Sequence, residues 1–246
     1  IYNYGLSASF ESNYCRCAAN ILKPQKMKTI YIQKRLLFFF LLLFTVISCD
    51  SFVEVDLPKS QLTSEGVFKD LATADAALTD IYAKIRDKGI LTGRNTGISC
   101  QMGNYTDELA AYGTPTSTTV SFYNNAVLPS NSDVAEYWNA SYNQIYAANA
   151  ILEGIADNIS FTVENKSKLQ GESLFIRALI HFYLVNLFGD IPYIKNTDYT
   201  KNNLVSRMPA ATVYENIIND LKNAIEMLPT SYSTTERIRP NKYTAH

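Results

Sequence analysis

Apolar residues recur every three or four positions in four segments of this chain, and that spacing limits what the chain can fold into. In residues 73–88 the repeat comprises Ala74, Ala77, Leu78, Ile81, Tyr82 and Ile85. The same spacing runs through residues 133–157, 165–188 and 209–229. Positions three and four apart share one face of an α-helix, so each segment predicts a helix with one buried face. The sequence therefore predicts an all-α fold.

The breaks between these segments predict helices in pairs. Gly89 follows the first helix, Gly189 ends the third, and Pro209 suits the first turn of the fourth. The second and third helices would form one antiparallel hairpin, and the fourth would pair with a helix that begins near Asn241. Stacked helix pairs are typical of a tetratricopeptide-like solenoid. Because the sequence ends at His246, we expect the second hairpin to be truncated at its C-terminal end.

The same periodicity predicts which side chains face the core. In residues 133–157 these are Val134, Trp138, Tyr142, Ile145, Asn149, Leu152 and Ile155. In residues 165–188 they are Leu169, Phe175, Ile176, Leu179, Phe182 and Tyr183. Trp138 is therefore predicted to pack in the core rather than to serve as a sugar platform. Arg177 is predicted to form a buried ion pair with Glu172 or Asp190.

Residues 27–48 have the pattern of an export signal. Lys28, Lys34 and Arg35 precede an apolar run over residues 36–47. That run is shorter than the roughly 20 residues of a membrane-spanning helix but fits the core of a signal peptide. A buried core helix is the alternative, and the absence of a polar face disfavours it. Residues 1–26 precede Met27 and are predicted to be upstream translation that is not part of the native protein.

The end of this signal resembles the lipobox of bacterial lipoproteins. Val46, Ile47 and Ser48 precede Cys49, which the resemblance identifies as the acylated first residue of the mature chain. Cleavage by an ordinary signal peptidase, leaving Cys49 free, is the alternative. Acidic residues and Pro58 follow, so residues 49–72 are predicted to form a lipidated tether. Residues 73–246 would then form the packed helical domain.

Residues 89–131 are predicted to form a long inserted loop, because glycine, proline and small polar residues replace the helical period. Long loops in compact domains are usually functional. This one contains six residues suited to stacking on sugar rings or to hydrogen bonding with hydroxyls: Asn104, Tyr105, Asp107, Tyr112, Phe122 and Tyr123. They are the candidate ligand-binding residues. The alternative is that the aromatic residues fasten the loop to the helical scaffold.

Composition argues against several functions. The chain has 22 Lys and Arg against 23 Asp and Glu, so the positive field that attracts nucleic acid is absent. The two histidines are His181 and the final residue, His246, which leaves little for a catalytic triad or a metal site. A carboxylate pair for glycoside hydrolysis stays an alternative, because the chain contains Asp107, Glu108, Asp133 and Glu136. We predict a protein without enzymatic activity, cofactor or metal.

One segment resembles a known family. Residues 171–193, GESLFIRALIHFYLVNLFGDIPY, resemble the SusD/RagB signature, an Arg-Ala helix followed by Phe-Gly-Asp-x-Pro. Residues 138–155 and 213–229 resemble the family's flanking helices in the expected order. The resemblance extends over residues 27–246 and corresponds to the N-terminal part of a family member.

This resemblance implies a surface-exposed lipoprotein of the outer membrane. Its fold would be a solenoid of tetratricopeptide-like hairpins with long inserted loops. Its partner would be a SusC-like TonB-dependent β-barrel transporter, to which it would deliver an oligosaccharide. A peptide-binding RagB-type protein and a helical scaffold lipoprotein without a ligand are the alternatives. The sequence indicates no particular glycan.

Overall fold

The structure is a computed structural model that describes residues 31–32, 34–37, 64–232 and 238–246. The chain divides into two units, residues 1–58 and 59–246. In the first unit the described residues are helical and exposed. Cys49 and most of the predicted signal and tether lie outside the described residues. Within the described ranges, no helix is both long and apolar enough to cross a membrane.

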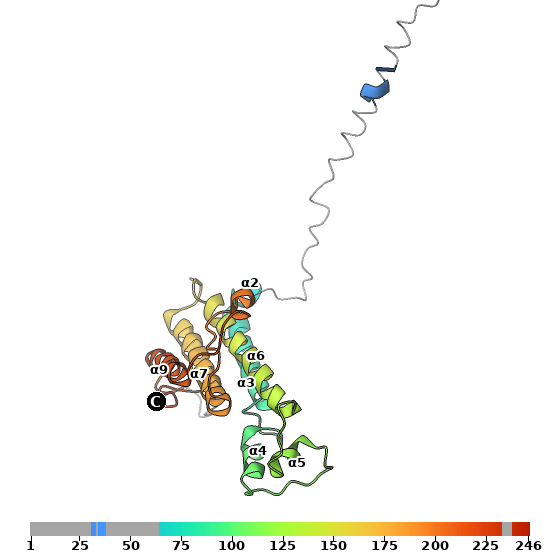
Figure 1. The fold of residues 1–246 in the computed structure, drawn as a ribbon. Coiled ribbons are helices and arrows are strands. Elements are labelled where there is room, and N and C mark those ends of the chain that lie inside the picture. The colour runs from blue at the N-terminus through green and yellow to red at the C-terminus, as the bar shows by residue number, and fades with distance from the viewer. Residues whose placement is uncertain (1–30, 33, 38–63, 233–237) are drawn as a thin grey trace, which may run out of the picture. The chain divides into compact units, whose positions relative to one another are not determined.

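The second unit is helical, which confirms the predicted fold class. Its described helices are α2 (Ser64–Val67), α3 (Leu71–Asp87), α4 (Ile98–Tyr105), α5 (Thr118–Tyr123), α6 (Ser132–Gly154), α7 (Val163–Phe188), α8 (Tyr199–Asn202) and α9 (Ala210–Met227). Helices α3, α6, α7 and α9 pack in that order, each beside the next (Figure 1). Helices α6 and α7 form the predicted hairpin.

The ends of the long helices follow local sequence rules. Asn131 caps α6 by accepting hydrogen bonds from the backbone N–H groups of Asp133 and Val134. The Thr162 side chain caps α7 in the same way. Helix α7 ends at Gly189, whose φ of +68° is a conformation that other residues rarely adopt. Pro209 is the N-cap of α9 rather than a first-turn residue, so that prediction was one position off.

The predicted inward faces of α6 and α7 were too narrow. Helix α7 contacts α3, α6 and α9, so it is buried on nearly all sides. Phe182, predicted to face inward, is 42% exposed, whereas the polar side chains of Glu172 and His181 are buried. Helix α6 is covered by both α3 and α7. A single apolar stripe predicts one buried face, and it fails where a helix is packed on two sides.

The structure corrects two predicted loop boundaries. Residues 89–131 contain α4 and α5, which pack against each other. These helices are too short for a clear period. Tertiary contacts hold α4 and the residues before it: Gln101 Nε2 donates to Asp133 Oδ2 at 2.7 Å, and the Tyr137 hydroxyl donates to the Thr96 carbonyl at 2.6 Å. The predicted tether also reaches too far, because α2 and the start of α3 fall within residues 64–72.

Residues 238–246 contain no helix, although one was predicted to begin near Asn241. Arg239 instead ties this segment to the core. Its Nη1 lies 3.0 Å from Glu172 Oε2, and its Nη2 donates to Thr79 Oγ1 at 2.7 Å. Glu172 is fully buried and also accepts from the Tyr82 hydroxyl at 2.9 Å. The segment therefore supplies the cation for a buried carboxylate.

Arg177 forms a buried ion pair as predicted, but with a different partner. Its Nε and Nη2 donate to the two carboxylate oxygens of Asp220, on α9, at 2.7 and 2.8 Å. Its Nη1 donates to Asn149 Oδ1, on α6, at 2.8 Å, and the Tyr193 hydroxyl donates to Asp220 at 2.6 Å. Glu172 pairs with Arg239, and Asp190 accepts from the Ala210 N–H. Sequence proximity misled the prediction, because the partner lies on another helix.

Replacing Asp220 by alanine is expected to lower the free energy of unfolding by about 3–5 kcal/mol, because Arg177 is left buried without its counter-charge. Denaturant unfolding followed by circular dichroism measures this. The control is Asp80→Ala, which breaks the exposed Asp80–Lys84 pair and should cost less than about 1 kcal/mol. Similar losses in the two variants would contradict the role given to the buried pair.

Candidate functional site

The six sequence-predicted ligand residues lie on α4, α5 and the segment between them. Tyr112 is 93% exposed and Tyr105 44%, and Tyr123 and Asp107 are also exposed. Asn104 and Phe122 are buried, and the Asn104 amide donates to Gln101 Oε1 at 3.5 Å. Helices α4 and α5 pack against each other, and Asp107 and Tyr112 lie on the segment between them. Four of the six side chains are accessible, and the other two are buried.

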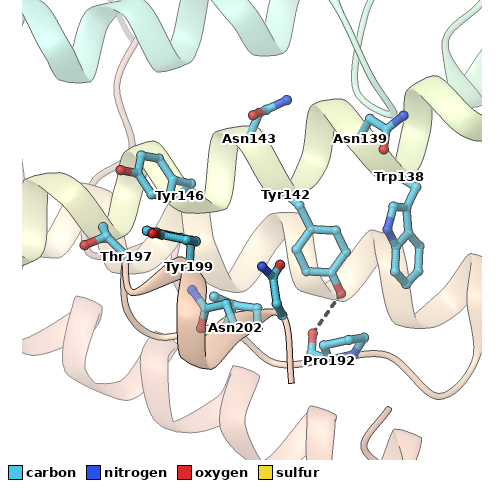
Figure 2. A pocket seen from close by; sticks show the side chains of 11 residues that line it. Trp138, Asn139, Tyr142, Asn143, Tyr146, Pro192, Thr197, Tyr199 and Asn202 are labelled. Carbon is cyan, nitrogen blue, oxygen red and sulfur yellow. Dashed lines mark hydrogen bonds between the residues drawn. The ribbon is translucent and has the colours of Figure 1, made fainter. Parts of the chain in front are cut away.

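A second surface was not predicted from the sequence. We call it the α6 groove, a cavity of about 510 Å³ between α6 and residues 192–203. Figure 2 shows its side chains: Trp138 and Tyr142 extend from α6 toward the facing segment, and the Tyr146 ring lies along α6. The groove is lined by Trp138, Asn139, Tyr142, Asn143, Tyr146, Pro192, Ile194, Thr197, Tyr199, Asn202 and Asn203.

Helical spacing explains the α6 side of this groove. Trp138, Tyr142 and Tyr146 are four residues apart, so their rings follow one another along the helix. The Trp138 and Tyr142 ring centroids are 4.9 Å apart, and Trp138 meets Phe188 edge-on at 5.2 Å. Trp138 is half-buried: it packs against the core, as predicted, and also lines the groove. The Arg207 guanidinium carbon lies 5.5 Å from its ring.

The opposite wall is held in place by hydrogen bonds to its backbone. The Tyr142 hydroxyl donates to the Pro192 carbonyl at 2.8 Å. The Asn149 amide donates to the carbonyls of Ile194 and Asn196 at 3.2 and 3.4 Å. Since Asn149 also accepts from Arg177, the buried ion pair and the groove wall share one side chain. The groove is therefore built on the core.

His181 fastens the same wall from α7. Its Nδ1 lies 2.8 Å from the Arg177 carbonyl, and its Nε2 lies 3.3 Å from the Ile194 N–H. This fits a neutral ring that donates from Nδ1 and accepts at Nε2. The ring also stacks on Tyr193, with centroids 3.9 Å apart. Burial lowers the pKa of His181 from its ordinary value to about 4.

The groove lining suits an uncharged ligand with flat apolar faces and many hydroxyl groups. Its described side chains include one Trp, three Tyr and four Asn, and none is Asp, Glu, Lys, Arg or His. Tyr146 is 52% exposed and Tyr199 is 73% exposed. Aromatic faces offer apolar area, and amides both donate and accept hydrogen bonds. The lining provides these contacts without a general base or a cation.

Sequence reasoning missed these residues because they come from two distant segments. Tyr146, Asn139 and Asn143 fall between the apolar positions of a helix, where polar residues usually face solvent. The cluster of Tyr199, Asn202 and Asn203 follows a predicted helix end. A stripe of aromatic and amide residues along α6 was the available signal. Only the path of residues 192–203 shows which partners it faces.

The SusD-like family described as "Starch-binding associating with outer membrane" matches residues 52–246. The chain belongs to the SusD-like family. This confirms the resemblance found at residues 171–193. The SusD-like protein P2 of Formosa agariphila is 31% identical over 211 residues, which are 84% of this chain and 40% of that protein. The SusD-like protein P25 of the same organism is 25% identical over 232 residues, 87% of this chain and 41% of that protein.

Solved structures of SusD-like proteins show the same helical fold. A SusD-like protein from Bacteroides fragilis has a TM-score of 0.60 at 22% identity, covering 77% of this chain and 36% of its own. A laminarin-binding SusD-like protein has a TM-score of 0.61 at 25% identity, covering 71% and 38%. The chain thus spans about two fifths of the length of the relatives it matches.

The neutral His181 predicts a pH-dependent stability. The unfolded chain takes up a proton near pH 6.5 and the folded chain only near pH 4, so the unfolded state binds more protons between these values. The stabilisation from the neutral His181 ring is fully present above about pH 6.5. As the pH decreases toward about 4, the free energy of unfolding falls by roughly 3 kcal/mol. Urea unfolding between about pH 6.5 and 5, above most carboxylate titration, measures the slope. His181→Gln should flatten it, and an unchanged slope would contradict this.

Proposed function

We propose that this protein is a glycan-binding lipoprotein of the cell surface, which passes its ligand to a SusC-like TonB-dependent transporter in the outer membrane. The observation that carries the proposal is the α6 groove. Its lining is aromatic and amide in character and contains no Asp, Glu, Lys, Arg or His. Membership of a family described as starch-binding, and likeness to a laminarin-binding protein, support the choice of ligand.

The chemistry of sugar rings matches the groove. A pyranose ring has an apolar face that stacks on an aromatic side chain and a rim of hydroxyls that both donate and accept hydrogen bonds. Tyr146 and Tyr199 offer accessible rings, and Asn139 and Asn143 offer amides on the neighbouring turns of α6. A groove lined without charge favours a neutral glycan over a charged peptide.

The residues predicted on α4 and α5 remain part of the proposal. Tyr105, Asp107, Tyr112 and Tyr123 are exposed, and they offer three aromatic rings and one carboxylate for contact with sugar faces and hydroxyls. Asn104 and Phe122 would support that surface from beneath. We propose that these four exposed residues contact ligand in addition to the α6 groove.

The protein is proposed to bind its ligand without cleaving it. Of the carboxylates left open by the sequence, Asp133 is buried and accepts a hydrogen bond from Gln101. Asp133 also sits in the first turn of α6, where a carboxylate stabilises the helix. None of the four carboxylates lines the α6 groove. A glycosidase needs two carboxyl groups on either side of the scissile bond, and the groove offers none there.

Tyr199→Ala is expected to weaken glycan binding about tenfold, because it removes one accessible stacking ring. Isothermal titration with neutral gluco-oligosaccharides, both β-1,3- and α-1,4-linked, measures the dissociation constant. The control is Tyr243→Ala, which removes an exposed tyrosine, 69% accessible, that does not line the groove. Binding of a peptide panel in place of glycans, or equal effects of the two substitutions, would count against the groove as a glycan site.

Cys49→Ala is expected to release the protein from the membrane fraction while its helices remain, since only the acylation site is lost. Fractionation of the tagged protein from its native host, with circular dichroism of the purified variant, measures both. The unaltered protein, extracted in detergent, should co-purify with a large β-barrel transporter. Retention of the variant in the membrane would contradict the lipid anchor. Recovery of the unaltered protein alone would contradict the transport role and favour a scaffold.

A further inference from the structure

A second cavity continues the α6 groove toward the C-terminal end of α6. It has a volume of about 540 Å³ and is lined by Phe68, Lys69, Tyr146, Ala150, Glu153, Gly154, Asp157, Asn158 and Thr197. Tyr146 and Thr197 line both cavities. The two cavities therefore meet at these side chains.

The two cavities lie along a row of α6 residues that winds around the helix. Trp138, Tyr142, Tyr146 and Ala150 are spaced four residues apart, and Gly154 continues the series. Each step of four residues turns the row by about 40°, because the helix has 3.6 residues per turn. From Trp138 to Gly154 the helix rises about 24 Å, at 1.5 Å per residue. This length is several times the width of one sugar ring. A ligand that fills both cavities must therefore be extended and must turn part of the way around α6 as it advances along the helix.

The junction between the cavities is rigidly held. Glu153 accepts hydrogen bonds from both the backbone N–H and the hydroxyl of Thr197, the first at 3.0 Å. Tyr146 stands beside Thr197 in Figure 2, on the α6 side of the groove, and is 52% exposed. A ring in this position can stack on a sugar unit at the passage from one cavity to the next.

The cavities differ in chemistry. The first is lined by aromatic and amide side chains, whereas the second adds the charged groups of Lys69, Glu153 and Asp157. Lys69 and Asp157 are exposed, so their charged groups are accessible to ligand hydroxyls. Charged groups form stronger hydrogen bonds to hydroxyls than neutral amides do. The first cavity thus favours ring stacking, and the second favours hydrogen bonding.

We infer that the ligand is a linear oligosaccharide of several units that follows this row along and around α6 and occupies both cavities, with one unit on Tyr146. This inference rests on the proposed glycan-binding function and adds the length and direction of the ligand. Short fragments occupy the first cavity, where the stacking rings are. Longer chains extend past Tyr146 to Lys69 and Asp157.

The test is a chain-length series on the purified protein. Isothermal titration uses laminari- and malto-oligosaccharides from the disaccharide to the hexasaccharide. For whichever of the two glycan types binds, we expect the dissociation constant to fall at least about tenfold from the disaccharide to the hexasaccharide. The variant Lys69→Ala/Asp157→Ala, altered only in the second cavity, should weaken hexasaccharide binding about tenfold and leave disaccharide binding within about twofold. Tyr199→Ala, altered only in the first cavity, should weaken both.

The outcomes separate this inference from the proposed function. Binding that is equally tight for the disaccharide and the hexasaccharide would overturn the two-cavity ligand and leave glycan binding in place. Equal effects of the double variant on both lengths would do the same. Absence of binding at every length would overturn the proposed function and the inference with it. Both replaced side chains are exposed, and matching thermal unfolding midpoints will show that the variant is folded.

Discussion

The ion pair between Arg177 and Asp220 is the interaction on which the rest of the packed unit depends. It joins α7 to α9, and its remaining hydrogen-bonding groups reach Asn149 on α6 and the Tyr193 hydroxyl. Burial and the nearby Asp220 carboxylate raise the pKa of Tyr193, which stays protonated and donates. A buried pair stabilises a fold only when its polar groups are all bonded. Here three helices and the groove wall must be in place together.

The candidate site inherits its geometry from that core. Asn149 accepts from Arg177 on one side and donates to two carbonyls of residues 192–203 on the other. His181 holds the Ile194 N–H from α7, and it does so only as a neutral ring. The groove is therefore rigid at its base, while Tyr146 and Tyr199 remain exposed at its rim. Binding to such a groove requires little ordering of the protein, which favours affinity.

Membership of the SusD-like family and the chemistry of the groove both support the proposed glycan ligand. The family is described as starch-binding and associated with the outer membrane, and the groove presents stacking rings and amides rather than catalytic groups. The chain corresponds to about two fifths of the relatives it matches. The exposed residues of α4, α5 and the segment between them share no lining residue with the α6 groove. We propose both as places where this protein contacts its ligand.

Periodicity alone determined the all-α class, the α6–α7 hairpin and most of the boundaries of α3, α6, α7 and α9, because helix spacing and capping are local. Local spacing could not reveal that α7 is buried on nearly all sides, and so Phe182 was placed inside. It could not find α4 and α5, which contacts such as that of Gln101 with Asp133 stabilise. It also paired Arg177 with near neighbours, whereas the partner is 43 residues away. The groove required residues of α6 to meet residues 192–203, and only the tertiary structure decides which distant side chains share a surface.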